Sequence, residues 1–173
     1  MRILGIDPGY AIVGFGTLEY TKNRFTTLQY GAITTAAHTV FEDRLCEVFD
    51  DMTQLLENTK PDALAIETLF FQSNQKTVMA VAEARGVILL AAKKANVPIF
   101  EYTPLQVKQS VSGYGKATKK QVQEMTKTIL HLDKIPKPDD TADALAMAIC
   151  HAYSYRSKQY GVALTKRQQM GYY

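Results

Sequence analysis

The chain has 173 residues, of which 46% are hydrophobic and 21% charged, and its formal net charge is +3. This length allows one domain with a sizeable core, and the composition excludes a disordered or fibrous protein. No apolar run approaches the length of a membrane span, and no secretory signal precedes the first strand, so we expect a cytoplasmic protein. Cys46 and Cys150 lack metal-site spacing, which predicts two reduced thiols in the core.

The charge is distributed unevenly along the chain. Residues 1–101 contain 9 Lys/Arg and 12 Asp/Glu, whereas residues 102–173 contain 11 Lys/Arg and 5 Asp/Glu. Three of the last five acids are Asp139, Asp140 and Asp143, so an acidic cluster lies within a basic half. This pattern suits an anionic polymer that is held by lysines and cut by a metal bound to carboxylates.

The hydrophobic pattern predicts strands and helices in a definite order. Residues 3–6 form an apolar run that ends at Asp7-Pro8-Gly9, where proline and glycine stop a strand. Two more strand patterns follow after short polar connections and complete an antiparallel meander. The two further meander strands are at 12–20 and 25–33, and later strands are at 63–67 and 97–101. The predicted helices are at 40–57, 74–96, 103–112, 118–130 and 140–156, and Thr118 is the expected N-cap of the fourth.

This element order predicts an α/β protein with a mixed five-stranded sheet flanked by helices. The order is similar to the ribonuclease H-like fold, which many enzymes share and which does not give a function alone. We expect one domain at 1–157. Residues 158–173 have no core pattern and include Lys166-Arg167, which predicts a basic, flexible tail.

Four carboxylates carry the strongest chemical signal. Asp7 and Glu67 end two predicted strands, and Asp140 and Asp143 share one face in the first turn of the last helix. Like charges that converge raise one another's pKa, and a hard divalent cation relieves this repulsion. Two such ions can activate water and stabilise the leaving oxygen of a phosphodiester. Asp139 directly precedes Asp140 and could share in metal binding.

Each of these acids also has a simpler explanation. Asp7 could cap its turn, and acids in a first helical turn commonly just complement the helix dipole. Glu67 could form an ion pair with Arg85 or Lys76. The combination of strand ends and a helix start favours a metal site over these separate explanations.

Several motifs, in order, resemble those of the RuvC family of Holliday junction resolvases. The similar segments are 5–9, 65–67, 84–86, 107–115 and 140–146, within a likeness that covers residues 1 to about 157. The resemblance implies a magnesium-dependent endonuclease of recombination and repair that cuts one phosphodiester in each of two strands of a four-way DNA junction. The nicks would carry 5′-phosphate and 3′-hydroxyl ends.

The resemblance also implies roles for residues and partners. Asp7, Glu67, Asp140 and Asp143 would be the catalytic metal ligands for two Mg²⁺ ions, which Mn²⁺ can replace. The expected assembly is a homodimer, and the expected partner is the RuvA–RuvB branch-migration complex. The symmetry of a four-way junction itself favours a two-fold dimer, with the apolar stretch 78–82 of the helix at 74–96 as the predicted contact.

The segment from Tyr102 to Lys120 contains four lysines and no acid, interrupted by a glycine turn. Compact ammonium groups on such a segment suit phosphate contacts, which dominate salt-sensitive affinity. The predicted DNA contacts are Lys108, Lys116, Lys119 and Lys120. Phe70 follows the second strand acid closely, and the family pattern assigns it to stacking on an unpaired base.

Three other functions fit parts of the pattern. An apolar strand ending Asp-x-Gly is also similar to the phosphate loop of actin-like sugar kinases and ATPases, but these need two such domains around a nucleotide cleft, and 173 residues supply only one. A RuvC-like nuclease that acts on structured RNA would share the same acids. In a non-catalytic DNA-binding module the acids would be structural, and it would show no magnesium-dependent strand scission.

Overall fold

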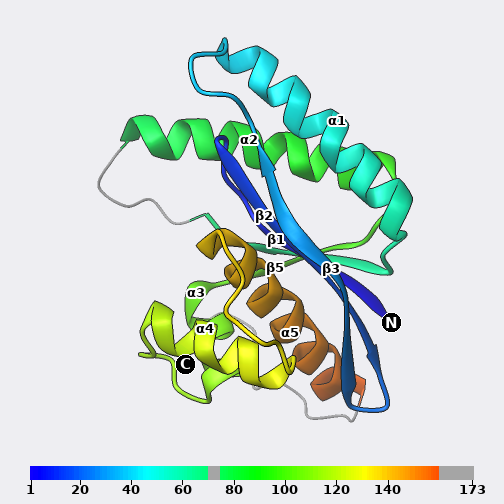
Figure 1. Cartoon of the computed structure of the whole chain (residues 1–173). Coiled ribbons are helices and arrows are strands. Elements are labelled where there is room, and N and C mark those ends of the chain that lie inside the picture. Colours follow the sequence, from blue (N-terminus) through cyan, green and yellow to red (C-terminus); the bar gives the residue numbers. More distant parts are fainter. Residues whose placement is uncertain (70–74, 160–173) are drawn as a thin grey trace.

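The computed structural model describes residues 1–69 and 75–159 and places a single sheet between two layers of helices (Figure 1). The strand order is β3-β2-β1-β4-β5. β1 pairs antiparallel with β2 and parallel with β4, so the sheet is mixed as predicted. The strands are β1 (Arg2–Asp7), β2 (Ile12–Thr21), β3 (Arg24–Thr34), β4 (Ala63–Glu67) and β5 (Ile99–Tyr102).

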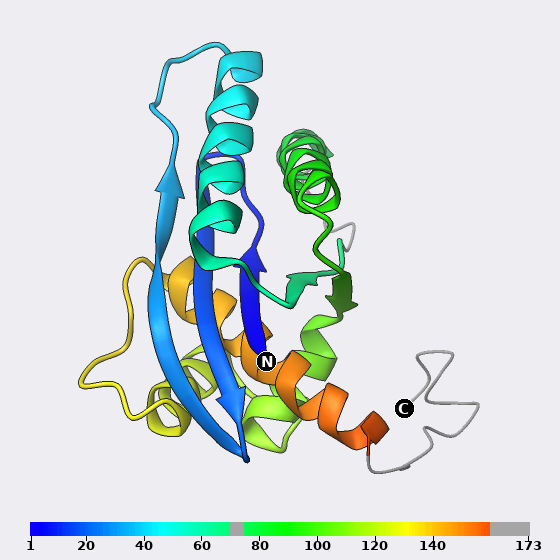
Figure 2. The same ribbon diagram turned by 90° about the vertical axis from the view of Figure 1, so that its right-hand side faces the viewer.

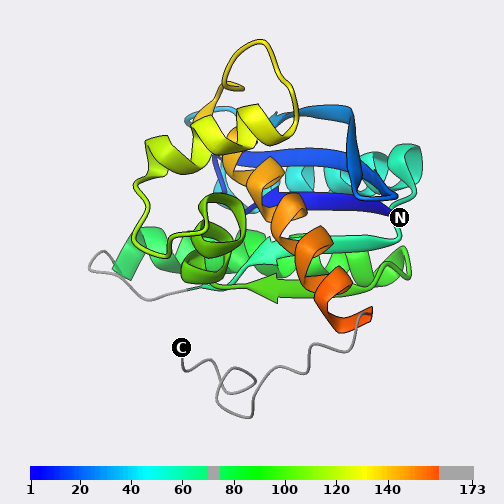
Figure 3. The same cartoon turned by 90° about the horizontal axis from the view of Figure 1, so that it is seen from below.

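Helices cover both faces of this sheet. Two of them, α1 (Phe41–Thr59) and α2 (Gln75–Lys94), contact each other on one face (Figure 2). On the other face α5 (Asp139–Gln159) runs across the strands, with α3 (Pro104–Ser112) and α4 (Lys119–Ile129) packed against it (Figure 3). The sequence therefore predicts the number, type and order of these elements correctly.

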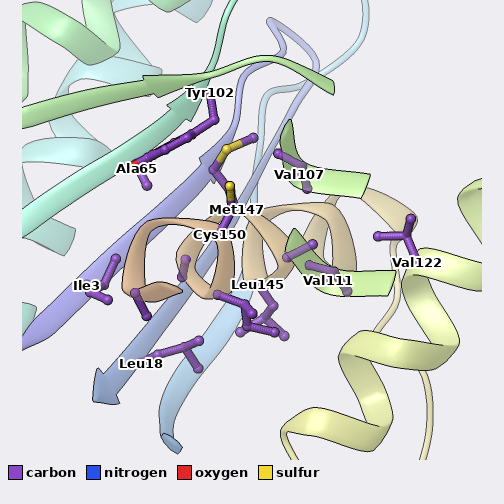
Figure 4. Packing of buried hydrophobic residues seen from close by; sticks show 14 of the residues in the cluster. Ile3, Leu18, Ala65, Tyr102, Val107, Val111, Val122, Leu145, Met147 and Cys150 are labelled. Atoms are coloured by element: carbon purple, nitrogen blue, oxygen red, sulfur yellow. The ribbon is translucent and has the colours of Figure 1, made fainter. Parts of the chain in front are cut away.

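The alternation of side chains along β1 divides the core into two halves. Leu4 and Ile6 are fully buried against α1 and α2, whereas Ile3 belongs to the cluster around α5. Figure 4 shows the second cluster, in which Leu145 and Met147 of α5 lie between the strands and the helices α3 and α4. Odd-numbered positions of β1 thus face α5, and Asp7 continues this series.

Some boundaries and one thiol differ from the sequence prediction. Thr118 is the N-cap of α4, as expected, and forms a capping box with Gln121. The last helix begins at Asp139, one residue before the predicted start, and extends to Gln159, beyond the predicted end at residue 156. Cys150 is buried as predicted, but the prediction for Cys46 is wrong because this residue lies on the exposed side of α1. Within the described ranges, no helix is long and apolar enough to cross a membrane.

Candidate active site

Asp7 and Glu67 end two neighbouring parallel strands at the same edge of the sheet. Ile6 pairs with Ile66 in the β1–β4 register, so the two acids occupy the next position on each strand. Because side chains alternate, both carboxylates point to the face that α5 covers. The convergence expected for these two acids is present in the structure.

Two glycines bring α5 unusually close to these strands. A Cβ on Gly5 would lie 2.0 Å from the carbonyl oxygen of Ala144, and one on Gly14 would lie 2.1 Å from that of Asp140. Gly14 is also the β2 partner of Asp7. Only residues without a side chain allow this approach, which places the first turn of α5 beside the end of β1.

A cavity of about 190 Å³ opens where these elements meet. Three of the predicted acids and two of the predicted lysines contribute to its lining, and a second cavity of about 210 Å³ adjoins Asp7 and Glu67 on the side of Pro8 and Leu69. The apolar part of the wall comes from α3, α4 and α5 (Figure 4). The lining residues of the first cavity are Asp7, Glu67, Pro104, Val107, Lys108, Lys119, Val122, Asp143, Ala146 and Met147.

Burial and mutual repulsion raise the pKa values of the cavity acids. For Asp7, burial and the charges of Asp143, Glu67 and Asp140 raise the pKa to about 8. Burial, followed by the charge of Asp143, raises the pKa of Glu67. Burial also raises the pKa of Asp143, although Lys119 opposes this shift. The acids of this site therefore cannot all be ionised at neutral pH unless a cation is present.

Lys119 supplies part of the missing positive charge. Its Nζ lies 2.8 Å from Oδ2 of Asp143. Burial disfavours the ammonium form, but the hydrogen bond to Asp143 and the charges of Asp143, Asp139 and Asp7 outweigh it, so the pKa of Lys119 is raised. The sequence predicted Lys119 as a DNA contact and gave no sign of this ion pair.

The donor set fits a hard divalent cation in chemistry. Carboxylate oxygens beside an open cavity are what Mg²⁺ accepts, since it keeps several waters and takes few protein ligands. Among the described residues, no three acid, His or Cys side chains stand close enough to hold one ion as they are placed here. Asp143 is instead turned to Lys119. Binding of a metal ion would therefore need the carboxylates to draw together.

The acids at the start of α5 separate into two groups. Asp143 lines the cavity, and the charge of Asp140 acts on Asp7 although Asp140 is not one of the lining residues. Asp139 forms an ion pair with Lys137 over 2.5 Å, and this contact lowers its pKa. Because the helix begins at Asp139, the prediction that Asp143 belongs to the first turn is wrong: it lies in the second turn.

The predicted nucleic-acid contacts also separate. Lys108 and Lys119 line the cavity, whereas Lys120 lines a different hollow with Tyr114 and Met125. Lys116 is exposed and lines neither. Phe70 lies outside the described residues. The alternative in which the Glu67 carboxylate pairs with Arg85 is wrong, because the carboxylate partner of Arg85 is Glu101.

A ribonuclease H-like sheet with carboxylates at the ends of two adjacent strands is typical of the class of nucleases that share this fold. The family model described as "Crossover junction endodeoxyribonuclease RuvC" matches residues 3–151. The chain therefore belongs to the RuvC family of crossover junction endodeoxyribonucleases. The expected family, fold and enzyme class are confirmed, and the family is one of Holliday junction resolvases, as predicted.

Individual relatives and solved structures agree with this assignment. RuvC from Ruminiclostridium cellulolyticum is 56% identical over 156 residues, which cover 90% of this chain and 94% of the relative. RuvC from Brevibacillus brevis is 55% identical over 152 residues, covering 88% and 92% of the two chains. Thermus thermophilus RuvC in complex with Holliday junction substrate has a TM-score of 0.86 at 33% identity, with coverage of 91% and 96%. The yeast mitochondrial resolvase Ydc2, 14% identical with a TM-score of 0.67 and coverage of 92% and 82%, shares the fold.

Proposed function

We propose that this chain binds four-way DNA junctions and cuts two strands symmetrically, in a divalent-cation-dependent reaction that leaves 5′-phosphate and 3′-hydroxyl ends. One observation carries the proposal: the half-buried Asp7 lines one cavity with Glu67 and Asp143, its pKa is raised to about 8, and Lys108 and Lys119 line the same cavity. Carboxylates that cannot ionise together, beside ammonium groups, suit a site for metal ions and a phosphodiester.

The proposed metal ligands are Asp7, Glu67, Asp140 and Asp143, with Mg²⁺ as the ion and Mn²⁺ as a substitute. The bound ions supply Lewis acidity toward the phosphate and lower the pKa of a bound water. The four acids would hold and orient these ions. The apolar wall of Val107, Val122 and Met147 limits the access of other water molecules to the cavity. Asp139 forms an ion pair with Lys137, which supports Asp140 as the residue that binds metal together with Asp143.

The lysines are proposed to bind the DNA backbone in two groups, one close to the cleaved phosphate and one farther from it. Lys108 and Lys119 lie close enough to the acids to reach the scissile phosphate, while Lys116 and Lys120 would contact phosphates farther along. Release of Asp143 by Lys119 frees an ammonium group for the phosphate and a carboxylate for the metal. Phe70 remains proposed as the residue that stacks on an unpaired base.

A homodimer built through α2 would place two such sites on opposite strands. Met79 and Leu90 of α2 are 63% and 53% exposed, and Gly86 between them has open space where a Cβ would be. With Glu83, these residues form one stripe on the helix surface.

The family extends the proposal to a RuvA–RuvB partner, and bacterial relatives named for DNA junctions support a cytoplasmic location.

A cleavage assay tests the proposal directly. A labelled four-way junction, a matched linear duplex and a structured RNA are incubated with the protein, with Mg²⁺ or EDTA, and run on a denaturing gel. We expect symmetric nicks in the junction alone, only with Mg²⁺. Asp7→Asn should bind the junction in EDTA but cut at least 100-fold more slowly, since it removes a charged ligand. Scission of RNA in preference to the junction, or binding without scission, would contradict the proposal.

A further inference from the structure

Arg85 lies on α2, behind the sheet as seen from α5, yet it reaches the strand end that carries Glu67. Its Nε donates a hydrogen bond to the main-chain carbonyl oxygen of Glu67 over 3.1 Å. Its Nη2 lies 2.5 Å from Oε2 of Glu101 on β5. The guanidinium thus joins α2, β4 and β5 at the point where β4 ends.

Side-chain alternation explains why Arg85 contacts the main chain of Glu67 and not its carboxylate. On β5, Ile99 packs with the α1–α2 cluster and Phe100 with the α5 cluster, so Glu101 faces α2. The Glu67 carboxylate faces α5, where burial and the charges of Asp143, Lys119 and Lys108 act on it. Arg85 therefore holds Glu67 from the opposite face.

The same stretch of main chain is held from β5 as well. Glu67 pairs with Tyr102 in the parallel register, and the amide of Thr68 donates to the carbonyl oxygen of Tyr102 over 2.9 Å. A strand end leaves carbonyl groups without ladder partners, and Arg85 supplies a donor for that of Glu67. The Arg85 side chain is 11% exposed and that of Glu101 50% exposed, so the guanidinium is the well-packed member of the pair.

We propose that Arg85 is a positioning residue for Glu67. By fixing the Glu67 carbonyl group, it sets the direction in which the carboxylate enters the cavity and hence the affinity of the site for a divalent cation. The inference rests on the proposed function, because it takes Glu67 as a metal ligand. Groups that orient metal ligands commonly change metal affinity or activity by about 10–100-fold when they are removed.

Arg85→Lys tests this assignment with a charge-conserving change. One ammonium group cannot reproduce a planar fork that donates to a carbonyl on one side and a carboxylate on the other. We expect Mn²⁺ affinity, measured by calorimetry without DNA, to fall by about 10–100-fold, and the Mg²⁺ midpoint of junction cleavage to rise by a similar factor. Junction binding in EDTA should not change.

Two further variants separate positioning from general stability. Glu101→Gln leaves the bond between Arg85 and Glu67 in place and should bind Mn²⁺ within twofold of the wild type. In a Glu67→Gln background, Arg85→Lys should have no additional effect on Mn²⁺ affinity, because Arg85 acts through Glu67. Both controls use circular dichroism and thermal unfolding to verify the fold.

Several outcomes would overturn the assignment. These are equal Mn²⁺ affinity of wild type and Arg85→Lys, an equal loss in Glu101→Gln, or an undiminished effect of Arg85→Lys in the Glu67→Gln background. If Arg85→Lys does not fold, Arg85→Gln takes its place, and failure of both to fold assigns Arg85 to stability alone. A wild-type protein that neither binds Mn²⁺ nor cuts the junction would instead contradict the proposed function, and the inference with it.

Discussion

Lys119 Nζ lies 2.8 Å from Oδ2 of Asp143, so a predicted DNA contact is in direct contact with a predicted metal ligand. The geometry follows from Thr118, the N-cap directly before α4, whose capping box fixes Lys119 as the first residue of the helix. The pair is partly exposed, so its own contribution to stability is small. Its importance lies in exchange: one ammonium group can serve the carboxylate or a phosphate.

This exchange predicts the behaviour of Lys119→Ala. Loss of a phosphate contact should weaken junction binding and reduce the slope of log affinity against log salt by about one unit. Cleavage at saturating protein should fall as well, because the cation nearest the acids is lost. Filter binding at several salt concentrations and single-turnover cleavage measure the two effects.

Lys120→Ala is the matched control, since Lys120 is adjacent in sequence but lines another hollow. It should reduce the salt slope by no more than Lys119→Ala and leave single-turnover cleavage near the wild-type rate. Identical cleavage losses in the two variants would show that the position of Lys119 beside Asp143 has no special role.

The raised pKa of Asp7 predicts how stability depends on pH in the absence of divalent cations. The ordinary pKa is 3.8 and the folded value is about 8, so between these pH values the folded state binds more protons than the unfolded state. The contribution of Asp7 to the free energy of unfolding then falls as pH rises from about 4 to 8, by up to about 1.4 kcal/mol per pH unit. Asp7→Asn should flatten this decline and be more stable than the wild type at pH 8 in EDTA.

Denaturant unfolding at several pH values measures this effect. Asp51→Asn, an exposed change on α1, is the control and should follow the wild type. Saturating Mg²⁺ should stabilise the wild type more at pH 8 than at pH 5, because the ion binds ionised carboxylates. Parallel pH profiles for wild type and Asp7→Asn in EDTA would mean that Asp7 ionises normally in the folded protein.

The close approach of α5 to β2 predicts the effect of Gly14→Ala. The new Cβ would lie 2.1 Å from a main-chain oxygen of Asp140, and since this Cβ is fixed rigidly to its own strand and the oxygen belongs to the helix backbone, α5 must move. Overpacking of this kind costs about 1–3 kcal/mol of stability. A displacement of ~1 Å at the acids can reduce cleavage by about 100-fold. Thermal unfolding and cleavage well below the melting temperature measure the two losses separately.

Gly31→Ala is the control for this change. Its Cβ would meet the ring of Phe15 at 3.1 Å, and a side chain can adjust where a helix backbone cannot. It should retain most cleavage activity. Wild-type cleavage by Gly14→Ala would show that the position of α5 does not limit the reaction.

The sequence predicted the strand-end acids because each feature that determines them is local. An apolar run that stops at Asp7, and another at Glu67, fixes both the strand ends and the face of each side chain. The parallel pairing of β1 and β4 then follows from the general rules of chain connection. These features need no knowledge of tertiary packing.

Other features depend on contacts between distant segments and left no local signal. The ion pair of Lys119 with Asp143 requires the packing of α4 on α5, and the bond from Arg85 to the Glu67 carbonyl requires α2 to lie behind β4. Cys46 lies among apolar residues in the sequence but on the exposed side of α1. On a helix, a shift of one position moves a side chain from the buried side toward solvent.

The exposed stripe of α2 predicts the effect of Leu90→Glu on assembly. Leu90 is 53% exposed, and a carboxylate buried at a two-fold interface would face its own copy in the partner, so the variant should be monomeric. Sedimentation should show about the 19.3 kDa mass of one chain, against twice that mass for the wild type. A monomer has one set of acids, so it should cut a junction in one strand per encounter.

Leu28→Glu, at a site 44% exposed on β3, is the matched control and should remain dimeric. A dimeric Leu90→Glu protein that still makes paired nicks would exclude this face of α2 as the interface, and a monomeric wild type would exclude the dimer itself.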